Sequence, residues 1–327
     1  MIEIYFRWFR FGRYFTSFIP TIFGEDMTRT GKDFMELLDV FDVVFLLDHP
    51  AFSFPYLAPP NYFYLGHFQL ENRVTKPLPP LYIDFLANCP HQHTFFVSFG
   101  SYIQDIFSVY QKFQIVLEAF RDMEVCFIMK LPEYVTERYQ LSRRQFLVQS
   151  WVPQRDLLGS GKMSGFVSHC GNNGRMESIF YNVPLMCIPL FGDQYHNARL
   201  VHRNDFGVYL RKEDLSVGSI QSSIEDILAK RDAFTGNMRN AVEIARSDPG
   251  AGISVLKFYV DLLIKNGNAG FLKNKIIPKQ WYYEVGNIDF VLLAFIFTMV
   301  VICAILLCIW SSFLRCARVV SKKIKTD

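Results

Sequence analysis

An α/β fold with a parallel sheet is predicted by alternation along the chain. Between Val43 and Tyr209, short β-rich runs alternate with helical patterns, which is typical of a doubly wound domain with helices on both faces of the sheet. Composition agrees with a folded protein, because half of the 327 residues are hydrophobic and 20% are charged. A length of this size allows one or two domains.

Six strands are expected from runs rich in β-branched and aromatic residues: 43–47, 94–98, 125–129, 146–150, 165–169 and 184–189. Helices are expected at 104–121, where the apolar positions form one broad face, and at 173–182 and 195–205. Three prolines interrupt this pattern at 71–82, so this stretch is interpreted as a linker. Residues 83–265 then form one doubly wound domain, and residues 1–70 look too short for a comparable one.

A membrane span is expected at 290–314, where 25 successive residues carry no charge. Residues 266–289 are the membrane-proximal segment, and the basic tail 315–327 favours the cytosolic side. Lys323 and Lys325 are compatible either with a dilysine retrieval signal or with ordinary stop-transfer residues. The aromatic N-terminus is interrupted by arginines and does not look like a signal peptide.

Two function classes are excluded by charge and composition. The net charge of +3 is small and the basic residues are scattered, so a nucleic-acid partner is not expected. Cys89, His91 and His93 have spacings unlike a zinc site, so no metal is expected. The seven cysteines show no framework spacing and predict no disulfide scaffold.

Candidate site residues follow the strands, where a parallel α/β sheet binds its ligands. After the run at 94–98, Gly100 allows close backbone approach, and the hydroxyls of Ser98 and Ser101 can donate to phosphate. Taken alone, this stretch is a weak signal, because Ser-Gly after a strand is more often just a turn.

A second candidate is FVSHCGNNGRMESIF at 166–180, in which His169 joins a strand to a helix. His169, Asn173 and the free N–H groups of the helix start can hold an anion, with Glu177 one turn further as an acceptor for a ribose diol. A capped helix with a core histidine is an equally good interpretation of these residues alone.

Two more candidates flank this segment. Asp193 and Gln194 can bracket neighbouring sugar hydroxyls, although an Asp here is also a common N-cap. Trp151, followed by Val-Pro, can stack on a flat base if its indole is exposed, and a buried core tryptophan is the alternative.

In order and spacing, the segment WVPQRDLLGSGKMSGFVSHCGNNGRMESIFYNVPLMCIPLFGDQ at 151–194 is similar to the signature of the UDP-glycosyltransferase (UDP-glucuronosyltransferase) family. The resemblance extends over nearly everything from residue 40 onward. It implies a GT-B fold whose C-terminal Rossmann-like domain binds the nucleotide sugar, with residues 1–70 as a remnant of the acceptor domain. The UDP-sugar contacts implied by matching positions are Ser98, Gly100, Ser101, Trp151, Gln154, His169, Gly171, Asn173, Gly174, Glu177, Asp193 and Gln194.

The resemblance implies transfer of a sugar from UDP-glucuronate or UDP-glucose to a small lipophilic acceptor, with inversion and without a metal or other cofactor. It also implies a single-pass type I protein of the endoplasmic reticulum membrane with a lumenal body and a cytosolic tail, as a homo-oligomer or hetero-oligomer of related transferases. Three positions depart from the pattern, namely Cys170 for a glycine, Arg155 for an asparagine and Gly192 for an alanine. A departure at Cys170 would matter if that residue needs a positive φ.

The family's catalytic histidine has no counterpart in this sequence, so the general base is unassigned. His49 and His67 lie in the part that matches the approach to the linker, and neither is expected to be that base. The alternative function is therefore a truncated, non-catalytic membrane protein that binds UDP-sugar or pairs with full-length relatives.

Overall fold

The computed structural model describes residues 42–53, 61–66, 68–71, 74–100, 106, 113–272, 292–303, 305–307 and 310. Two compact units divide the chain: Val43–Asn268, and Met1–Asp42 together with Ala269–Asp327. The candidate site lies entirely in the first of these units.

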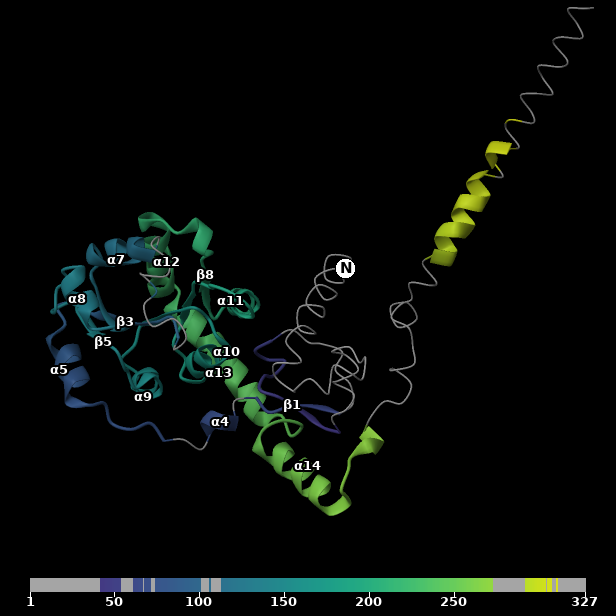
Figure 1. The fold of residues 1–327 in the computed structure, drawn as a ribbon, viewed down its shortest axis with the longest axis horizontal. Helices are drawn as coiled ribbons and strands as arrows, with labels where there is room; N and C mark the ends of the chain where they lie inside the picture. Colours follow the sequence, from purple (N-terminus) through teal and green to yellow (C-terminus); the bar gives the residue numbers. More distant parts are fainter. Residues whose placement is uncertain are drawn as a thin grey trace, which may run out of the picture. The chain divides into compact units, whose positions relative to one another are not determined.

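A six-stranded parallel sheet forms the centre of the first unit (Figure 1). Its strands are β3 (His93–Ser98), β4 (Val125–Lys130), β5 (Phe146–Gln149), β6 (Gly165–Ser168), β7 (Leu185–Cys187) and β8 (Gly207–Tyr209). They lie in the order β5-β4-β3-β6-β7-β8, and every neighbouring pair is parallel. The chain therefore winds outward in opposite directions from the β3–β6 pair, which makes this pair the switch point of the sheet.

Helices α7 (Gln114–Arg121), α8 (Tyr134–Arg138) and α12 (Val217–Ala229) cover one face of this sheet (Figure 1). On the other face lie α5 (Pro80–Asn88), α9 (Gln154–Gly159), α10 (Asn172–Phe180), α11 (Gln194–Arg203) and α13 (Arg231–Ser247). Strand alternation separates the two cores: Phe95 and Val97 belong to the first, whereas Phe96 belongs to the second. Both faces of the sheet are thus buried, as in other doubly wound proteins.

A second, two-stranded parallel sheet pairs β1 (Val44–Leu46) with β2 (Tyr62–Tyr64). Phe63 of β2 stacks on Tyr259 of α14 (Ile253–Asn266), with ring centroids 3.8 Å apart. The remaining elements of this unit are α4 (Phe68–Glu71) and the short 3-10 helix η2 (Lys212–Asp214). Residues 47–52, which follow β1, contact helix α10, as described below.

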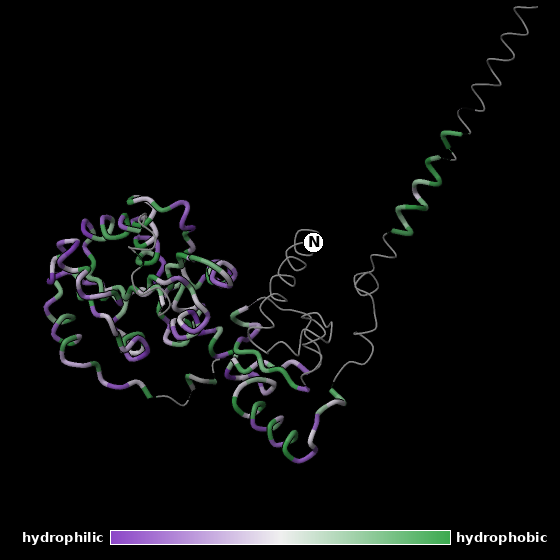
Figure 2. Tube along the Cα trace, viewed as in Figure 1, coloured by the Kyte–Doolittle hydropathy of each residue, from purple (hydrophilic) through white to green (hydrophobic). Residues whose placement is uncertain are grey.

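The second unit contributes η3 (Gly270–Leu272) and a helical stretch at 292–303, 305–307 and 310. The described side chains of this stretch are exposed and, apart from Thr298, hydrophobic (Figure 2). Within the described parts of the chain, no helix combines the length and the hydropathy needed for a membrane crossing. The predicted span at 290–314 falls partly outside those parts.

All six predicted strands are present, with ends that shift by at most two residues, and the helices predicted at 173–182 and 195–205 are α10 and α11. Of the helix predicted at 104–121, residues 114–121 are α7, whereas residues 104–105 and 107–112 lie outside the described residues. Strands β2 and β8, each only three residues long, were not predicted, nor were helices α4, α5, α8, α9, α12, α13 and α14. The expectation of no disulfide scaffold was wrong, because Cys89 pairs with Cys126 and Cys170 with Cys187.

Candidate functional site

The candidate site lies at the carboxyl edge of the central sheet, around the switch point between β3 and β6. Ser98 and Ser168 are paired at the ends of these two strands. Gly100 and His169 follow immediately, one in each loop. Because α/β sheets bind ligands in the crevice at such a point, the topology brings these two predicted residues together where a ligand is expected.

The His169 ring is enclosed by two glycines. A Cβ atom added to Gly100 would lie 2.9 Å from His169 Nε2, and one added to Gly171 would lie 2.6 Å from it. Gly100 also has a φ of +90°, which disfavours other residues. The glycines therefore make room for the imidazole, in addition to any close approach to a ligand.

His169 is held in its neutral form. Burial is the main cause that lowers the pKa of its imidazole, and the positive charge of Lys130 lowers it further. The main-chain carbonyl of Ser98 and the Asp193 carboxylate oppose this shift. Among the residues that the structure describes, the buried Nδ1 of His169 has no hydrogen-bond partner. A buried polar atom left in this way is uncommon in structural cores and is typical of a site.

Helix α10 begins directly beside His169. Gly171 is its N-cap and supplies no side-chain hydrogen bond, so the interpretation of Asn173 as a cap is wrong. Asn173 is exposed and makes no hydrogen bond to any described residue, whereas Gly174 is buried. No side chain thus caps the first N–H groups of α10, and the unpaired side-chain amide of Asn173 lies among them. Together these donors suit an anion.

Gln154 and Glu177, both predicted ribose contacts, are joined directly. Gln154 Nε2 donates to Glu177 Oε2 over 2.6 Å, linking the start of α9 to α10. Burial raises the pKa of the Glu177 carboxyl, and the bond from Gln154 and the charge of Arg155 counteract the rise. The pair forms a half-buried acceptor that is oriented before any ligand arrives.

Trp151 is exposed, with 70% of its surface accessible. It lies two residues beyond the end of β5, and its main-chain oxygen accepts a hydrogen bond from the Tyr82 hydroxyl over 3.2 Å. The interpretation as a buried core tryptophan is therefore wrong. An exposed indole at a ligand-binding edge is available for stacking.

Asp193 and Gln194 lie at the start of helix α11, and they differ in how many hydrogen bonds their side chains already make within the protein. Gln194 is buried, and its Oε1 accepts from the N–H groups of Leu190 (2.8 Å) and Phe191 (3.2 Å). Only its amide nitrogen remains for a ligand, so the expected acceptor role of Gln194 is wrong. Asp193 is exposed at the N-cap, and one carboxylate oxygen accepts from Asn197 Nδ2 over 2.9 Å.

Cys170 stands where the family pattern has a glycine, so its φ angle decides whether this departure matters. Its φ is +58°, in the left-handed region, and its side chain is fully buried in a disulfide with Cys187. Its carbonyl accepts from Asn197 Nδ2 over 3.0 Å, so one buried amide bridges Cys170 and Asp193. The turn after His169 does require a positive φ.

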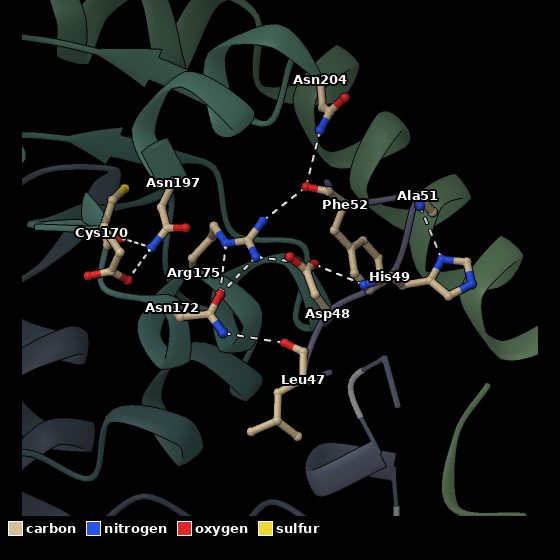
Figure 3. A network of polar contacts seen from close by, with 11 residues as sticks. Leu47, Asp48, His49, Ala51, Phe52, Cys170, Asn172, Arg175, Asn197 and Asn204 are labelled. Atoms are coloured by element: carbon tan, nitrogen blue, oxygen red, sulfur yellow. Dashed lines mark hydrogen bonds and ion pairs between the residues drawn. The ribbon is translucent and has the colours of Figure 1, made fainter. Parts of the chain in front are cut away.

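A second polar cluster gathers around the start of α10 (Figure 3). Arg175 is fully buried and donates to Asn172 Oδ1 (2.8 and 3.3 Å), to the Phe52 carbonyl (2.9 Å) and to Asp48 Oδ1 (3.3 Å). Asn172 in turn donates to the Leu47 carbonyl over 3.3 Å. This Arg175 network fastens residues 47–52 to α10, and each of the three guanidinium nitrogens donates at least one hydrogen bond.

His49 belongs to the same segment, and neither of its ring nitrogens is free. Nδ1 accepts from the Ala51 N–H over 3.1 Å, so in the neutral ring the proton lies on Nε2, which faces Asp248 Oδ2 at 3.0 Å. This bond lowers the pKa of the Asp248 carboxyl. His49 is therefore no general base, in agreement with the sequence analysis.

Several predicted residues lie outside this geometry. Ser101 and His67 lie outside the described residues. Ser98 is buried, and its Oγ accepts from the Gly100 N–H over 3.4 Å. No group of three His, Cys, Asp or Glu side chains gathers as a metal site within the described part, and Cys89 is in a disulfide.

Three residues at or beside the site were missed by sequence reasoning: Lys130, Arg175 and Asn197. Lys130 ends β4 at the same edge, which the strand pattern could have indicated. Arg175 and Asn197 carry no such signal, because their positions on α10 and α11 look like ordinary polar helix positions.

Similar proteins share sequence with most of the chain. UDP-glucosyltransferase 2 of Dactylopius coccus is 27% identical over 300 residues, which is 89% of this chain and 55% of that protein. UDP-glucuronosyltransferase 3A1 of Bos taurus is 28% identical over 260 residues, which is 76% of this chain and 46% of that protein. The chain therefore spans about half the length of the curated relatives that it matches.

The fold is shared with a solved structure, glycosyltransferase VinC in complex with DTDP. The two have a TM-score of 0.52 at 16% identity, and the match covers 66% of this chain and 51% of that one. This likeness and the parallel sheet confirm the GT-B-type α/β fold. Residues 2–325 match the family described as "UDP-glucoronosyl and UDP-glucosyl transferase". Since nearly the whole chain is matched, it belongs to the family of UDP-glucuronosyl and UDP-glucosyl transferases.

Proposed function

We propose that this chain transfers a sugar from UDP-glucuronate or UDP-glucose to a small lipophilic acceptor. The observation that carries the proposal is the convergence of polar and aromatic groups at one sheet edge. Exposed Trp151, neutral His169 beside the uncapped α10 start, and the Gln154–Glu177 pair all follow strands that end at this edge. Their chemistry suits, in this order, the base, the diphosphate and the ribose of a nucleotide sugar.

Each part of the donor has a counterpart in this arrangement. The indole of Trp151 stacks on uracil, and Gln154 with Glu177 binds the ribose hydroxyls. The diphosphate is held by His169, Asn173 and the N–H groups at the start of α10, where Gly171 and Gly174 lie, together with Ser98, Gly100 and Ser101 at the end of β3 and in the loop after it. Asp193 accepts from sugar hydroxyls, and Gln194 donates to them through its amide nitrogen.

The chemistry follows from where charge develops. An acceptor hydroxyl oxygen attacks the anomeric carbon from the face opposite UDP and releases its proton to solvent, so the anomeric configuration inverts as the bond to the diphosphate oxygen breaks. The departing UDP gains negative charge next to His169 and the positive end of α10, and both are oriented before reaction. These groups serve where other transferases use a cation, and the proposal requires no metal or other cofactor.

We also propose that residues 290–314 anchor the chain in the endoplasmic reticulum membrane, with the body lumenal and the tail 315–327 cytosolic. The uncharged run and the basic residues after it support this orientation. The two disulfides support a lumenal body, because disulfides persist in oxidising compartments. A membrane anchor keeps the enzyme close to lipophilic acceptors, and it allows pairing with related transferases in the same bilayer.

A transfer assay tests this function. The full chain in detergent is incubated with UDP-glucuronate or UDP-glucose and a set of hydrophobic phenols, and the products are identified by mass spectrometry. Glycoside formation that disappears in Asp193→Ala is the expected result. UDP-sugar binding without any product would refute transfer by this chain and favour a non-catalytic binding partner of longer relatives.

A further inference from the structure

We infer that the Cys170–Cys187 disulfide is a positioning crosslink that fixes His169 for the donor diphosphate. Cys170 and Cys187 are then positioning residues: they affect UDP binding by fixing the position of His169, between β6 and helix α10. The inference deepens the proposed function and rests on it, since it concerns how the same site is kept in its binding geometry.

Cys187 ties down the chain on both sides of His169. It is the ladder partner of Ser168, the residue before the histidine, where β6 pairs with β7. The Ile188 N–H also donates to the Ser168 carbonyl over 2.8 Å. Beyond the histidine, the disulfide returns Cys170 to the same Cys187. His169 is thus the single residue between two attachments to one point of β7.

The crosslink holds Cys170 in a conformation that a cysteine otherwise disfavours. A φ of +58° places its Cβ close to backbone atoms, and glycine is the residue that adopts this region at little cost. Two hydrogen bonds assist the disulfide: the Cys170 N–H donates to Ser168 Oγ over 3.0 Å, and Asn197 donates to its carbonyl over 3.0 Å (Figure 3). The disulfide therefore does what a glycine would do by lacking a side chain.

The His169 ring has little room to move, so its position depends on this backbone. Its Nε2 lies within 3 Å of where Cβ atoms would stand on Gly100 and Gly171. If Cys170 relaxed towards a negative φ, Gly171 would turn with it, and the ring and the start of α10 would no longer face the same point. Diphosphate affinity should fall, because both groups are needed at one location.

The chain contains a matched control in its second disulfide. Cys89 at the end of α5 pairs with Cys126 near the start of β4, away from the carboxyl edge. It closes a sequence separation of 37 residues, against 17 for Cys170–Cys187. A longer loop predicts at least an equal contribution to stability by the chain-entropy argument. Loss of UDP binding through general destabilisation would therefore affect this control equally.

The test compares three variants of the full chain by UDP titration calorimetry in detergent, with thermal unfolding measured alongside. Cys187→Ala is expected to weaken UDP binding about tenfold, as when one charge-assisted hydrogen bond is lost. Cys170→Gly/Cys187→Ala should bind within about twofold of wild type, because glycine adopts the turn without a crosslink. Cys89→Ala/Cys126→Ala should lower the melting temperature and leave UDP affinity unchanged.

Equal affinity of Cys187→Ala and wild type would overturn the inference, as would equal losses in Cys187→Ala and the Cys89/Cys126 control. Failure of the glycine variant to recover affinity, or free thiols on Cys170 and Cys187 in non-reducing peptide mapping, would overturn it too. Should Cys187→Ala fold poorly, Cys187→Ser, which is close in size to cysteine, takes its place with the same expectations.

Two further measurements separate this inference from the proposed function. If His169→Gln loses UDP affinity while Cys187→Ala retains it, the donor site stands and the crosslink inference alone falls. The second measurement needs no nucleotide: the ring C–H signal of His169 is followed by NMR as pH varies. Burial lowers the pKa of this imidazole, so in Cys187→Ala it should rise towards its ordinary value of 6.5 if the ring shifts. An unchanged titration would contradict positioning whatever UDP does.

Discussion

Two polar clusters meet at the start of helix α10, and they differ in how completely their hydrogen bonds are made. On one side, the Arg175 network is buried and its donors are used within the protein. On the other, neither His169 Nδ1 nor the Asn173 side chain has a hydrogen-bond partner among the described residues, and Trp151 is exposed. Adjacent asparagines, 172 and 173, fall on opposite sides of this division.

The difference separates structure from function on physical grounds. A buried polar group that finds its partners within the chain stabilises one conformation, whereas a buried group without a partner, such as His169 Nδ1, is costly unless a ligand completes it. The Arg175 network should therefore control folding, and the His169 side should control UDP binding.

The largest effect is expected for Arg175→Met. Removing the guanidinium leaves Asp48 and the Phe52 carbonyl without their buried partner, and the free energy of unfolding should fall by about 3 kcal/mol. Urea unfolding monitored by tryptophan fluorescence measures it. Exposed Arg239→Met on α13 is the matched control, expected within about 0.5 kcal/mol of wild type. A similar small change in Arg175→Met would break the comparison.

For His169→Gln, UDP affinity should fall by about 2 kcal/mol with little loss of stability. Exposed His202→Gln is the control and should bind normally.

The wild type should also lose stability as pH falls below 6.5, because the pKa of the folded-state His169 imidazole is lowered and the unfolded chain binds the proton more readily. His169→Gln should lack this part of the acid sensitivity. Identical unfolding curves against pH for both proteins would contradict the assignment.

Asn172→Ala and Asn173→Ala should show opposite defects. Loss of Asn172 removes an acceptor from Arg175 and should cost about 1 kcal/mol of stability while sparing UDP affinity. Loss of Asn173 should weaken UDP binding by about the same amount and leave the melting temperature unchanged. Paired calorimetry and thermal unfolding measure both quantities. Equal profiles for the two variants would remove the distinction between the clusters.

A smaller effect, of less than about 1 kcal/mol, is expected for Glu177→Gln. Burial raises the pKa of the Glu177 carboxyl, so its ionised form costs stability that increases as pH rises above the ordinary value of 4.5. The variant should therefore melt higher than wild type at pH 7, with the difference vanishing near pH 4.5, and should bind UDP more weakly. A lower melting temperature at pH 7 would show that the ionised carboxylate is stabilising.

The periodicity of the sequence was sufficient to predict five of the six strands of the central sheet, because strands such as β3 and β4 are buried on both faces and form continuous apolar runs. Of the helices that cover the sheet, it predicted α10, α11 and the region of α7, but not the others. The site residues were found because they follow those strands. What the sequence could not show is which atoms are already engaged: Gln194 and Gln154 look alike in a sequence, yet one fixes its own loop and the other orients Glu177. The Arg175 network and the Cys170–Cys187 pair depend on contacts distant in sequence, which periodicity does not carry.

The most direct test of the account is a UDP titration of the full-length chain and of the double variant Trp151→Ala/His169→Gln, with unfolding measured on the same samples. Saturable binding of one UDP per chain is expected for the wild type, and no measurable binding for the variant at unchanged folding. A wild-type chain that does not bind UDP, or a variant that binds it as well as the wild type, would contradict the claim that this sheet edge is the donor site.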